Sequence, residues 1–148
     1  MTSSTGQTIT TNMPPYRLDD QVGFIFRRAT QRHLGIFAGE IPDLTPTQFA
    51  AIAKLHERGA VSQNELGRQT AMDAATIKGV IDRLRKKSYV TTRRDSNDQR
   101  RIFVELSAEG RKIYAASEDA AHRITEQTLS PLSPAERATF LKLLTKIT

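Results

Sequence analysis

Residues 62–87 read SQNELGRQTAMDAATIKGVIDRLRKK, and residues 89–106 read YVTTRRDSNDQRRIFVEL. The first stretch holds two helix starts, with Ser62 and Asp73 as N-caps, on either side of a short turn at residues 70–72. In the second stretch the apolar period changes from 3.6 to 2, and two β-branched segments flank a polar tip, which predicts a β-hairpin. Helix, tight turn, helix and hairpin follow one another in the order of a winged helix-turn-helix.

Further helices surround this segment on both sides. Capping residues and apolar spacing predict them over about 17–39, from Thr45 to just before Gly59, over about 108–129 and from Ser133 to about 147. The first and the last two exceed what a winged helix needs, and their apolar stripes require a partner. We therefore expect a mostly α (α+β) fold in one continuous domain. Its parts are a flexible tail (1–15), a winged helix-turn-helix lobe with a β-hairpin wing (45–107) and dimerisation helices (16–44 and 108–148).

The basic charge of the chain is concentrated in this lobe. The 148 residues carry a formal net charge of +6. Residues 68–112 hold twelve basic and six acidic side chains, so the whole excess lies there, and the remainder has ten of each. A concentrated basic excess is typical of a surface that binds a polyanion, although a solvated charged face gives the same count.

The helix over about 73–87 suits the major groove of duplex DNA. Its apolar stripe is expected to pack inward, and the outward residues near its start are small, which allows close approach to base edges. Arg83 is expected to meet phosphate, whereas Lys86 and Lys87 are expected to contact phosphate or to be solvated. The DNA-binding residues that we predict are Ser62, Gln63, Asp73, Ala74, Ala75, Thr76, Lys78, Gly79, Arg83, Arg93, Asp98, Arg100 and Arg101.

Composition excludes several other functions. The chain has no cysteine, which excludes a disulfide framework, a thiolate zinc site and a cysteine nucleophile, and which fits a cytoplasmic protein. Neither a signal-peptide pattern nor an apolar run long enough for a membrane span is present, so we expect no membrane association. His33, His56 and His122 are far apart in the sequence, and we expect no metal and no cofactor. No catalytic grouping or phosphate-binding glycine loop is visible, so the sequence does not indicate an enzyme.

On these residues the sequence resembles the MarR family of transcription regulators, from about Leu18 to the C-terminus. Three stretches carry the resemblance. Residues 44–49 (LTPTQF) are similar to the family's second-helix entry, and residues 73–84 (DAATIKGVIDRL) to its recognition helix, with Gly79 where the family often has Arg. Residues 95–110, which begin DSNDQRR and end LSAEG, are similar to its wing and to the entry of its fifth helix.

The resemblance implies roles for the wing and for the terminal helices. In the family a wing Asp orients a wing Arg that enters the minor groove, and by position these are Asp98 and Arg100. The chemistry agrees, because an ion pair preorganises the guanidinium and narrow A·T-rich grooves attract Arg. The terminal helices of the family intertwine into a homodimer. Because a dimer has two recognition helices related by symmetry, the expected partner is double-stranded DNA with a pseudo-palindromic operator.

Many members of the family also bind a small aromatic anion, which releases DNA. Helical geometry gives candidate residues, because His33 and Phe37 share one face of the first helix, and Phe49 and His56 share one face of the second. A carboxylate could pair with basic residues on the first helix. The predicted ligand residues are Tyr16, Arg17, Arg28, His33, Phe37, Phe49 and His56. The alternative that the histidine and the phenylalanines are ordinary core residues stays open.

The function expected from this sequence is a sequence-specific, DNA-binding transcription regulator, a repressor that a small aromatic carboxylate or phenol releases. The alternative is a winged-helix module that binds another protein and does not read DNA. Such a module should lack exposed wing arginines, whereas the predicted wing carries Arg93, Arg94, Arg100 and Arg101.

Overall fold

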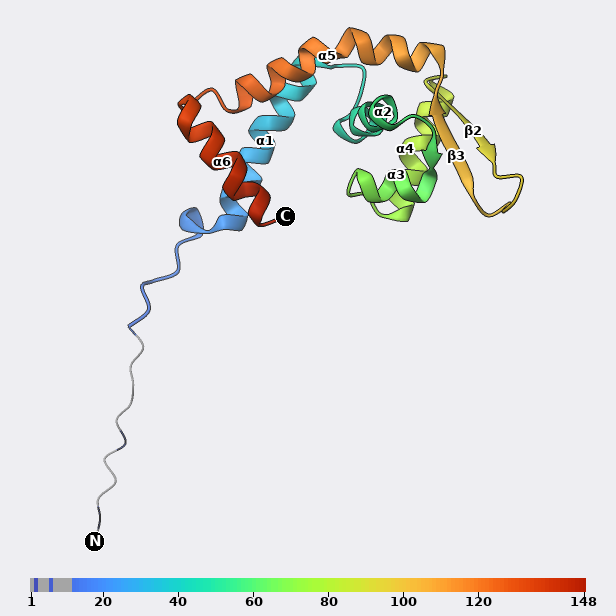
Figure 1. Cartoon of the computed structure of the whole chain (residues 1–148). Coiled ribbons are helices and arrows are strands. Elements are labelled where there is room, and N and C mark those ends of the chain that lie inside the picture. Colours follow the sequence, from blue (N-terminus) through green and yellow to red (C-terminus); the bar gives the residue numbers. More distant parts are fainter. Residues whose placement is uncertain (1, 3–5, 7–11) are drawn as a thin grey trace.

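The computed structural model describes residues 2, 6 and 12–148, so the tail predicted for 1–15 lies mostly outside the described residues (Figure 1). The described part is mostly helical with one small antiparallel sheet. Its elements are η1 (Leu18–Asp20), α1 (Val22–Glu40), α2 (Pro46–Arg58), β1 (Val61–Ser62), α3 (Gln63–Gln69), α4 (Ala74–Lys86), β2 (Val90–Arg94), β3 (Ile102–Leu106), α5 (Ala108–Thr128) and α6 (Pro134–Lys146).

Five of the helices begin where the capping residues predict. Thr45 and Ser133 form capping boxes with Gln48 and Glu136, and both are followed by proline at the first helical position. In α3, α4 and α5 the N-cap oxygen accepts a hydrogen bond from the backbone N–H three residues later, which satisfies a donor that the first helical turn leaves free. The predicted helix, turn, helix and hairpin order is therefore confirmed.

The prediction for the first helix is wrong at its start and agrees to one residue at its end. Residues 18–20 form a 3₁₀ turn, Gln21 has an extended backbone, and α1 begins only at Val22. At the other end the helix continues through Gly39 to Glu40. It stops there because Pro42 has no N–H with which to extend it, and the last bond runs from Ile41 N to Phe37 O.

The sheet has one strand more than the predicted hairpin. The strand order is β1-β3-β2, with all pairs antiparallel. The added strand β1 contains only Val61 and Ser62, which pair with Val104 and Phe103. Two residues are too few to display the alternation that identifies a strand in a sequence.

One hydrophobic core joins the helix-turn-helix to the sheet and continues into α5. The predicted inward stripe of α4 is buried, as are Leu66 of α3 and Val104 of β3. Phe37 at the end of α1, together with Ala120 and Ile124 of α5, belongs to the same cluster. The winged lobe is thereby attached to the terminal helices through packed side chains.

Helix α5 is fixed at both of its ends (Figure 1). At the wing, Ser107 N donates to Tyr89 O at 3.0 Å, and a Cβ on Gly110 would collide with that same carbonyl, so the helix approaches the sheet where only glycine fits. At its far end α5 packs against α1, and the Arg32 guanidinium donates to the carbonyls of Gln127 and Thr128.

The outer faces of α1 and α6 expose large apolar side chains. No residue of α6 is buried, although the whole helix is described. Nine such side chains on η1, α1, α6 and its C-cap are exposed: Leu18, Val22, Ile25, Phe26, Leu34, Phe140, Leu141, Leu143 and Ile147. Contiguous apolar surface of this kind marks an interaction site in a folded protein. In the described part of the chain, no helix has the length and apolarity needed to cross a bilayer.

Candidate functional site

The helix α4 presents a small, polar outer face because its apolar stripe is turned into the core. Ala74, Ala75, Thr76 and Lys78 are all exposed on the first two turns. The side chain of Asp73 accepts a hydrogen bond from Thr76 N at 2.7 Å, and this bond lowers the pKa of the Asp73 carboxyl below its ordinary value of 3.8.

The turn that precedes α4 is tight, and its residues have structural roles. Ala71 adopts a left-handed backbone with φ of 55°, which reverses the chain between α3 and α4. Ser62 is buried, and its hydroxyl accepts from Glu65 N at 3.2 Å. The Ser62 hydroxyl is therefore engaged as a helix cap, whereas the neighbouring Gln63 is half-buried.

The wing tip is organised by short hydrogen bonds around Asp98. Its carboxylate accepts from Arg100 N at 3.0 Å and lies 3.5 Å from Arg100 Nε, while 94% of the Arg100 side chain is exposed. Arg94 Nη1 donates to Gln99 O at 2.7 Å and closes the tip. The fixed turn thus holds an otherwise free guanidinium at the end of the hairpin.

Phe103 organises two more wing arginines, and the sequence analysis did not single it out. The guanidinium of Arg93 lies 4.9 Å from the centre of the Phe103 ring, and that of Arg101 lies 5.3 Å from it. Arg93 is the cross-strand partner of Phe103, and Arg101 precedes it by two residues, so all three share one face of the hairpin. Strand alternation in the sequence is the signal that could have found this cluster.

The cations of α4 and the wing are largely free of acidic partners. Lys78 pairs with Asp82 at 3.1 Å, but within the described residues no carboxylate lies within 4 Å of the charged groups of Arg83, Arg85 or Lys86. Charges that are not neutralised by the protein remain available to a polyanion. The predicted DNA-binding residues therefore lie on one lobe, which is made of β1, α3, α4 and the hairpin β2–β3 (Figure 1).

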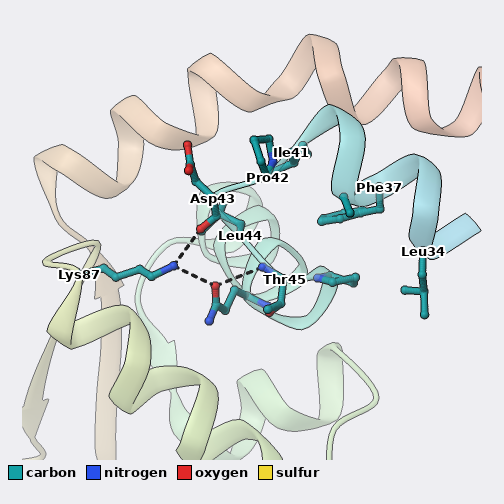
Figure 2. Close-up of a pocket in the computed structure, with 11 residues that line it drawn as sticks. Leu34, Phe37, Ile41, Pro42, Asp43, Leu44, Thr45 and Lys87 are labelled. Atoms are coloured by element: carbon teal, nitrogen blue, oxygen red, sulfur yellow. Dashed lines mark hydrogen bonds between the residues drawn. The ribbon is translucent and has the colours of Figure 1, made fainter.

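A cavity of about 450 Å³ lies where α1, the following loop and α2 meet the end of α4 (Figure 2). Its walls are mostly apolar, and its polar groups include Lys87 Nζ. This ammonium donates to Asp43 O at 2.8 Å and to Gln48 Oε1 at 3.4 Å. The sequence predicts a phosphate contact or a solvated side chain for Lys87. The side chain is exposed, and folding adds a hydrogen bond to the loop at 41–45 that the sequence does not predict.

Three of the predicted ligand residues lie close together in an aromatic array. Phe37 meets Phe49 edge to face at 6.2 Å between ring centres, and Phe49 is stacked at 6.2 Å on Tyr114 of α5. The His56 ring also stacks on Tyr114, with 4.0 Å between the ring centres. Burial raises the pKa of the Tyr114 hydroxyl. Tyr114 is not among the ligand residues that the sequence predicts. Of the seven predicted residues, only Phe37 also lines the 450 Å³ cavity.

The other predicted ligand residues are not part of the array. His33 is half-buried, and its Nδ1 lies 2.9 Å from Thr128 Oγ1 between α1 and α5. Tyr16, Arg17 and Arg28 are exposed near or on the outer face of α1. Among the described residues no group of three His, Cys, Asp or Glu side chains could hold a metal ion.

A helix-turn-helix with an arginine-bearing wing, on a lobe that carries most of the charge excess, defines a winged-helix DNA-binding protein. Comparison with known proteins gives the family. Residues 44–102 match the model of the MarR family. The chain is also 38% identical over 135 residues to the transcriptional repressor NicR of Pseudomonas putida. The matched residues make up 90% of this chain and 85% of NicR. The chain belongs to the MarR family of transcription regulators.

Two solved structures are similar over nearly the whole chain. A probable transcriptional regulator of Pseudomonas aeruginosa is 50% identical, with a TM-score of 0.86 over 89% of this chain and all of that one. BpsR of Bordetella bronchiseptica, whose DNA binding is regulated by 6-hydroxynicotinic acid, is 38% identical, with a TM-score of 0.87 over 90% of this chain and 97% of BpsR. The predicted fold class and the prediction of a transcription regulator that is not an enzyme are confirmed.

Proposed function

We propose that this protein is a cytoplasmic, homodimeric repressor that binds a pseudo-palindromic operator and is released from it by a small aromatic acid. The lobe at 45–107 reads DNA, and the helices at 16–44 and 108–148 form the dimer. The observation that carries the proposal is the set of free cations on the outer face of α4 and on the wing, in a chain that is neutral outside residues 68–112.

The DNA-binding roles divide by the chemistry of the side chains. The small residues at the start of α4 (Ala74, Ala75, Thr76) approach base edges, and Lys78 and Gly79 follow on the same face. Arg83 contacts phosphate, and Gln63 reaches the backbone from the preceding helix. Arg93, Arg100 and Arg101 bind at the minor groove, with Asp98 holding the tip. Ser62 and Asp73 support this surface as helix caps.

The exposed apolar side chains of η1, α1 and α6 support a dimer of this chain. A single copy leaves Val22, Ile25 and Leu143 more than half exposed, and α6 buries none of its residues within the chain. A second copy related by two-fold symmetry would cover both faces at once, since an isologous interface uses the same patch on each protomer. It would also present two copies of α4 to two half-sites.

The aromatic effector is supported by the relatives and by the aromatic side chains between α1 and α2. BpsR, to which this chain is similar over most of its length, is regulated by 6-hydroxynicotinic acid, which suggests a hydroxylated aromatic carboxylate as the effector. Such a ring would contact Phe37, with Phe49, His56 and His33 around it. Arg28 would be available on α1, and Tyr16 and Arg17 just before η1. The effector releases DNA only if it binds the DNA-free arrangement more tightly than the DNA-bound one.

A gel-shift titration with the promoter DNA of the protein's own locus tests the proposal. We expect binding that weakens linearly with salt on a log–log plot, because phosphate contacts release counterions. We also expect millimolar 6-hydroxynicotinate, salicylate or 4-hydroxybenzoate to reverse the shift. A flat salt response would instead favour a winged-helix module that binds proteins.

A further inference from the structure

One face of the wing hairpin carries an aromatic ring with two cations beside it, Phe103 with Arg93 and Arg101. The guanidinium carbons lie 4.9 Å and 5.3 Å from the centre of the ring, within the roughly 6 Å over which an aromatic face attracts a cation. Phe103 is half-buried, whereas both arginines are exposed. The ring is therefore a fixed base on which two long and flexible side chains are held.

The register of the sheet explains why one ring reaches both arginines. Arg93 of β2 is directly opposite Phe103 of β3, and Arg101 precedes Phe103 by two residues. Because side chains alternate along a strand, all three lie on the face opposite to that of the buried Val104. On the other side of β3, Phe103 is opposite Ser62, the N-cap of α3. The ring is thus placed between the wing and the start of the helix-turn-helix.

The two guanidiniums have no competing polar partner in the protein. Among the described residues no carboxylate lies within 4 Å of either group, and neither group donates a hydrogen bond. On the same hairpin Arg94 donates to Gln99 O, and Arg100 pairs with Asp98. A guanidinium that interacts with a ring through its face keeps the N–H groups at its edge for an acceptor. Both cations can therefore bond an anion while they remain beside the ring.

Two like charges beside one ring prepare the wing for a polyanion. The guanidiniums repel each other in the free protein, and a negative charge next to them relieves this repulsion. The ring also restricts their rotamers before binding, which reduces the conformational entropy that is lost when each side chain meets a phosphate. A charged face that serves only solubility does not require an aromatic side chain beneath its cations.

We propose that Phe103 is a positioning residue of the DNA interface, whose ring holds the guanidiniums of Arg93 and Arg101 where they donate to the phosphates that border the minor groove. The inference rests on the proposed DNA binding and adds to it a residue that acts through two others. Arg100 is held separately, by the turn at Asp98. The wing therefore has two sets of cations, one at the tip that enters the groove and one on the hairpin face that binds the backbone.

Fluorescence anisotropy of the full chain with the promoter DNA of its own locus tests the proposal. We expect Phe103→Leu, which keeps an apolar side chain and removes the ring, to weaken binding about 5- to 30-fold, as expected for the loss of two cation–π contacts. Phe103→Tyr keeps the ring and should retain most of the affinity. The matched control Thr91→Ala changes an exposed side chain on the same face of β2 and should bind as the wild type does.

The effect of Phe103→Leu should act through the two arginines. In a protein that carries Arg93→Gln and Arg101→Gln the affinity is already lower, and adding Phe103→Leu should lower it no further. An additional loss as large as in the wild type would overturn the proposal, because the ring would then contribute to binding without the cations.

A graded change of the ring separates its electrostatic role from its packing. Mono-, di- and trifluorinated phenylalanine at position 103 nearly keep the size of the ring and withdraw negative charge from its face. We expect the affinity for DNA to fall with each added fluorine. Equal affinity across this series would overturn the proposal, even if Phe103→Leu failed to fold. Failure of the wild type to bind the promoter DNA would instead overturn the proposed DNA binding itself.

Discussion

Arg100 is held at the wing tip almost entirely by its own turn. Its side chain is 94% exposed, and its charged group pairs with Asp98 of the same turn, so we expect the fold not to depend on it. We expect Arg100→Ala to weaken operator binding at least tenfold, because a guanidinium in a narrow minor groove contributes both charge and shape recognition. Fluorescence anisotropy with operator DNA measures the effect.

The control for this prediction is Arg58→Ala, which removes an exposed guanidinium at the end of α2, where Glu57 is its partner. It should reduce affinity only slightly. The melting temperature of Arg100→Ala should equal that of the wild type. Operator affinity that is unchanged at physiological salt would contradict a minor-groove role for Arg100.

Asp73 makes the stability of the protein depend on acid pH. Its carboxylate accepts from Thr76 N, so its pKa in the folded protein lies below the ordinary value of 3.8. As the pH falls, the Asp73 carboxyl therefore takes up a proton in the unfolded chain before it does so in the folded protein. The stability that the ionised cap contributes is present above pH 3.8, and it is lost as the pH falls through the lowered pKa of the folded state. Asn is an equally good N-cap that cannot titrate. We expect Asp73→Asn to lose less stability than the wild type between pH 5 and pH 3.

Urea denaturation of both proteins at the two pH values measures this difference. Other carboxyls with lowered pKa, such as those of Glu40 and Glu136, titrate in both proteins and cancel in the comparison. Equal losses in the two proteins would show that the Asp73 cap does not carry the acid sensitivity.

At the scale of single residues, local patterns identify some of the site and miss the rest for a physical reason. Asp98 and Arg100 are two residues apart, so their contact is visible in the sequence. Lys87 and Asp43 are separated by 44 positions, and only the packed fold shows that they meet. The same holds for Tyr114 against His56, where the stacking depends on the way α5 crosses α2.

At the scale of the element, α4 contains a glycine that its packing does not require. A Cβ at Gly79 would meet only Arg83 Nη1, at 3.7 Å, which is an ordinary contact. Since glycine in a helix interior costs about 0.5–1 kcal/mol relative to alanine, we expect Gly79→Ala to stabilise the protein by that amount. If the bare backbone allows close approach to DNA, the same variant should bind the operator more weakly.

Thermal unfolding and operator titration on one preparation test both halves of this prediction. Gly35→Ala is the matched control, because Gly35 lies inside α1 with nothing within 4 Å of its added Cβ. It should raise the melting temperature and leave DNA affinity unchanged. Full operator affinity in Gly79→Ala would remove the functional reason for the glycine.

Element boundaries follow from the sequence where a side chain caps the backbone. The starts of α2, α3, α4, α5 and α6 are predicted because the N-cap residue itself makes the bond. The start of α1 has no such signal, since Gln21 makes no side-chain cap, and there the prediction is five residues early. The strand β1 forms only because β3 offers it an edge, which is a tertiary effect.

At the scale of the whole molecule, the exposed apolar face of α6 predicts a dimer that one charge can disrupt. Leu143 is more than half exposed and sits among other exposed apolar residues of the helix. We expect the wild type to have twice the monomer mass of 16.5 kDa, and Leu143→Glu to shift it toward the monomer. Light scattering over a concentration series measures the masses.

The control is Lys142→Glu, which places the same carboxylate one position away on the helix. A monomeric wild type at micromolar concentration would refute the dimer. Because both half-sites must be occupied together, the Leu143→Glu protein should also lose operator affinity, whereas its wing and α4 are unaltered.

The attachment of α5 at both ends has a geometric consequence. With 21 residues at a rise of about 1.5 Å each, the helix is about 32 Å long and acts as a rigid lever between α1 and the base of the wing. A tilt of about 5° about the end that Arg32 holds would move the wing end by about 3 Å, close to the base-pair step of about 3.4 Å. Small displacements in the terminal helices are therefore large enough to put the wing out of register with DNA.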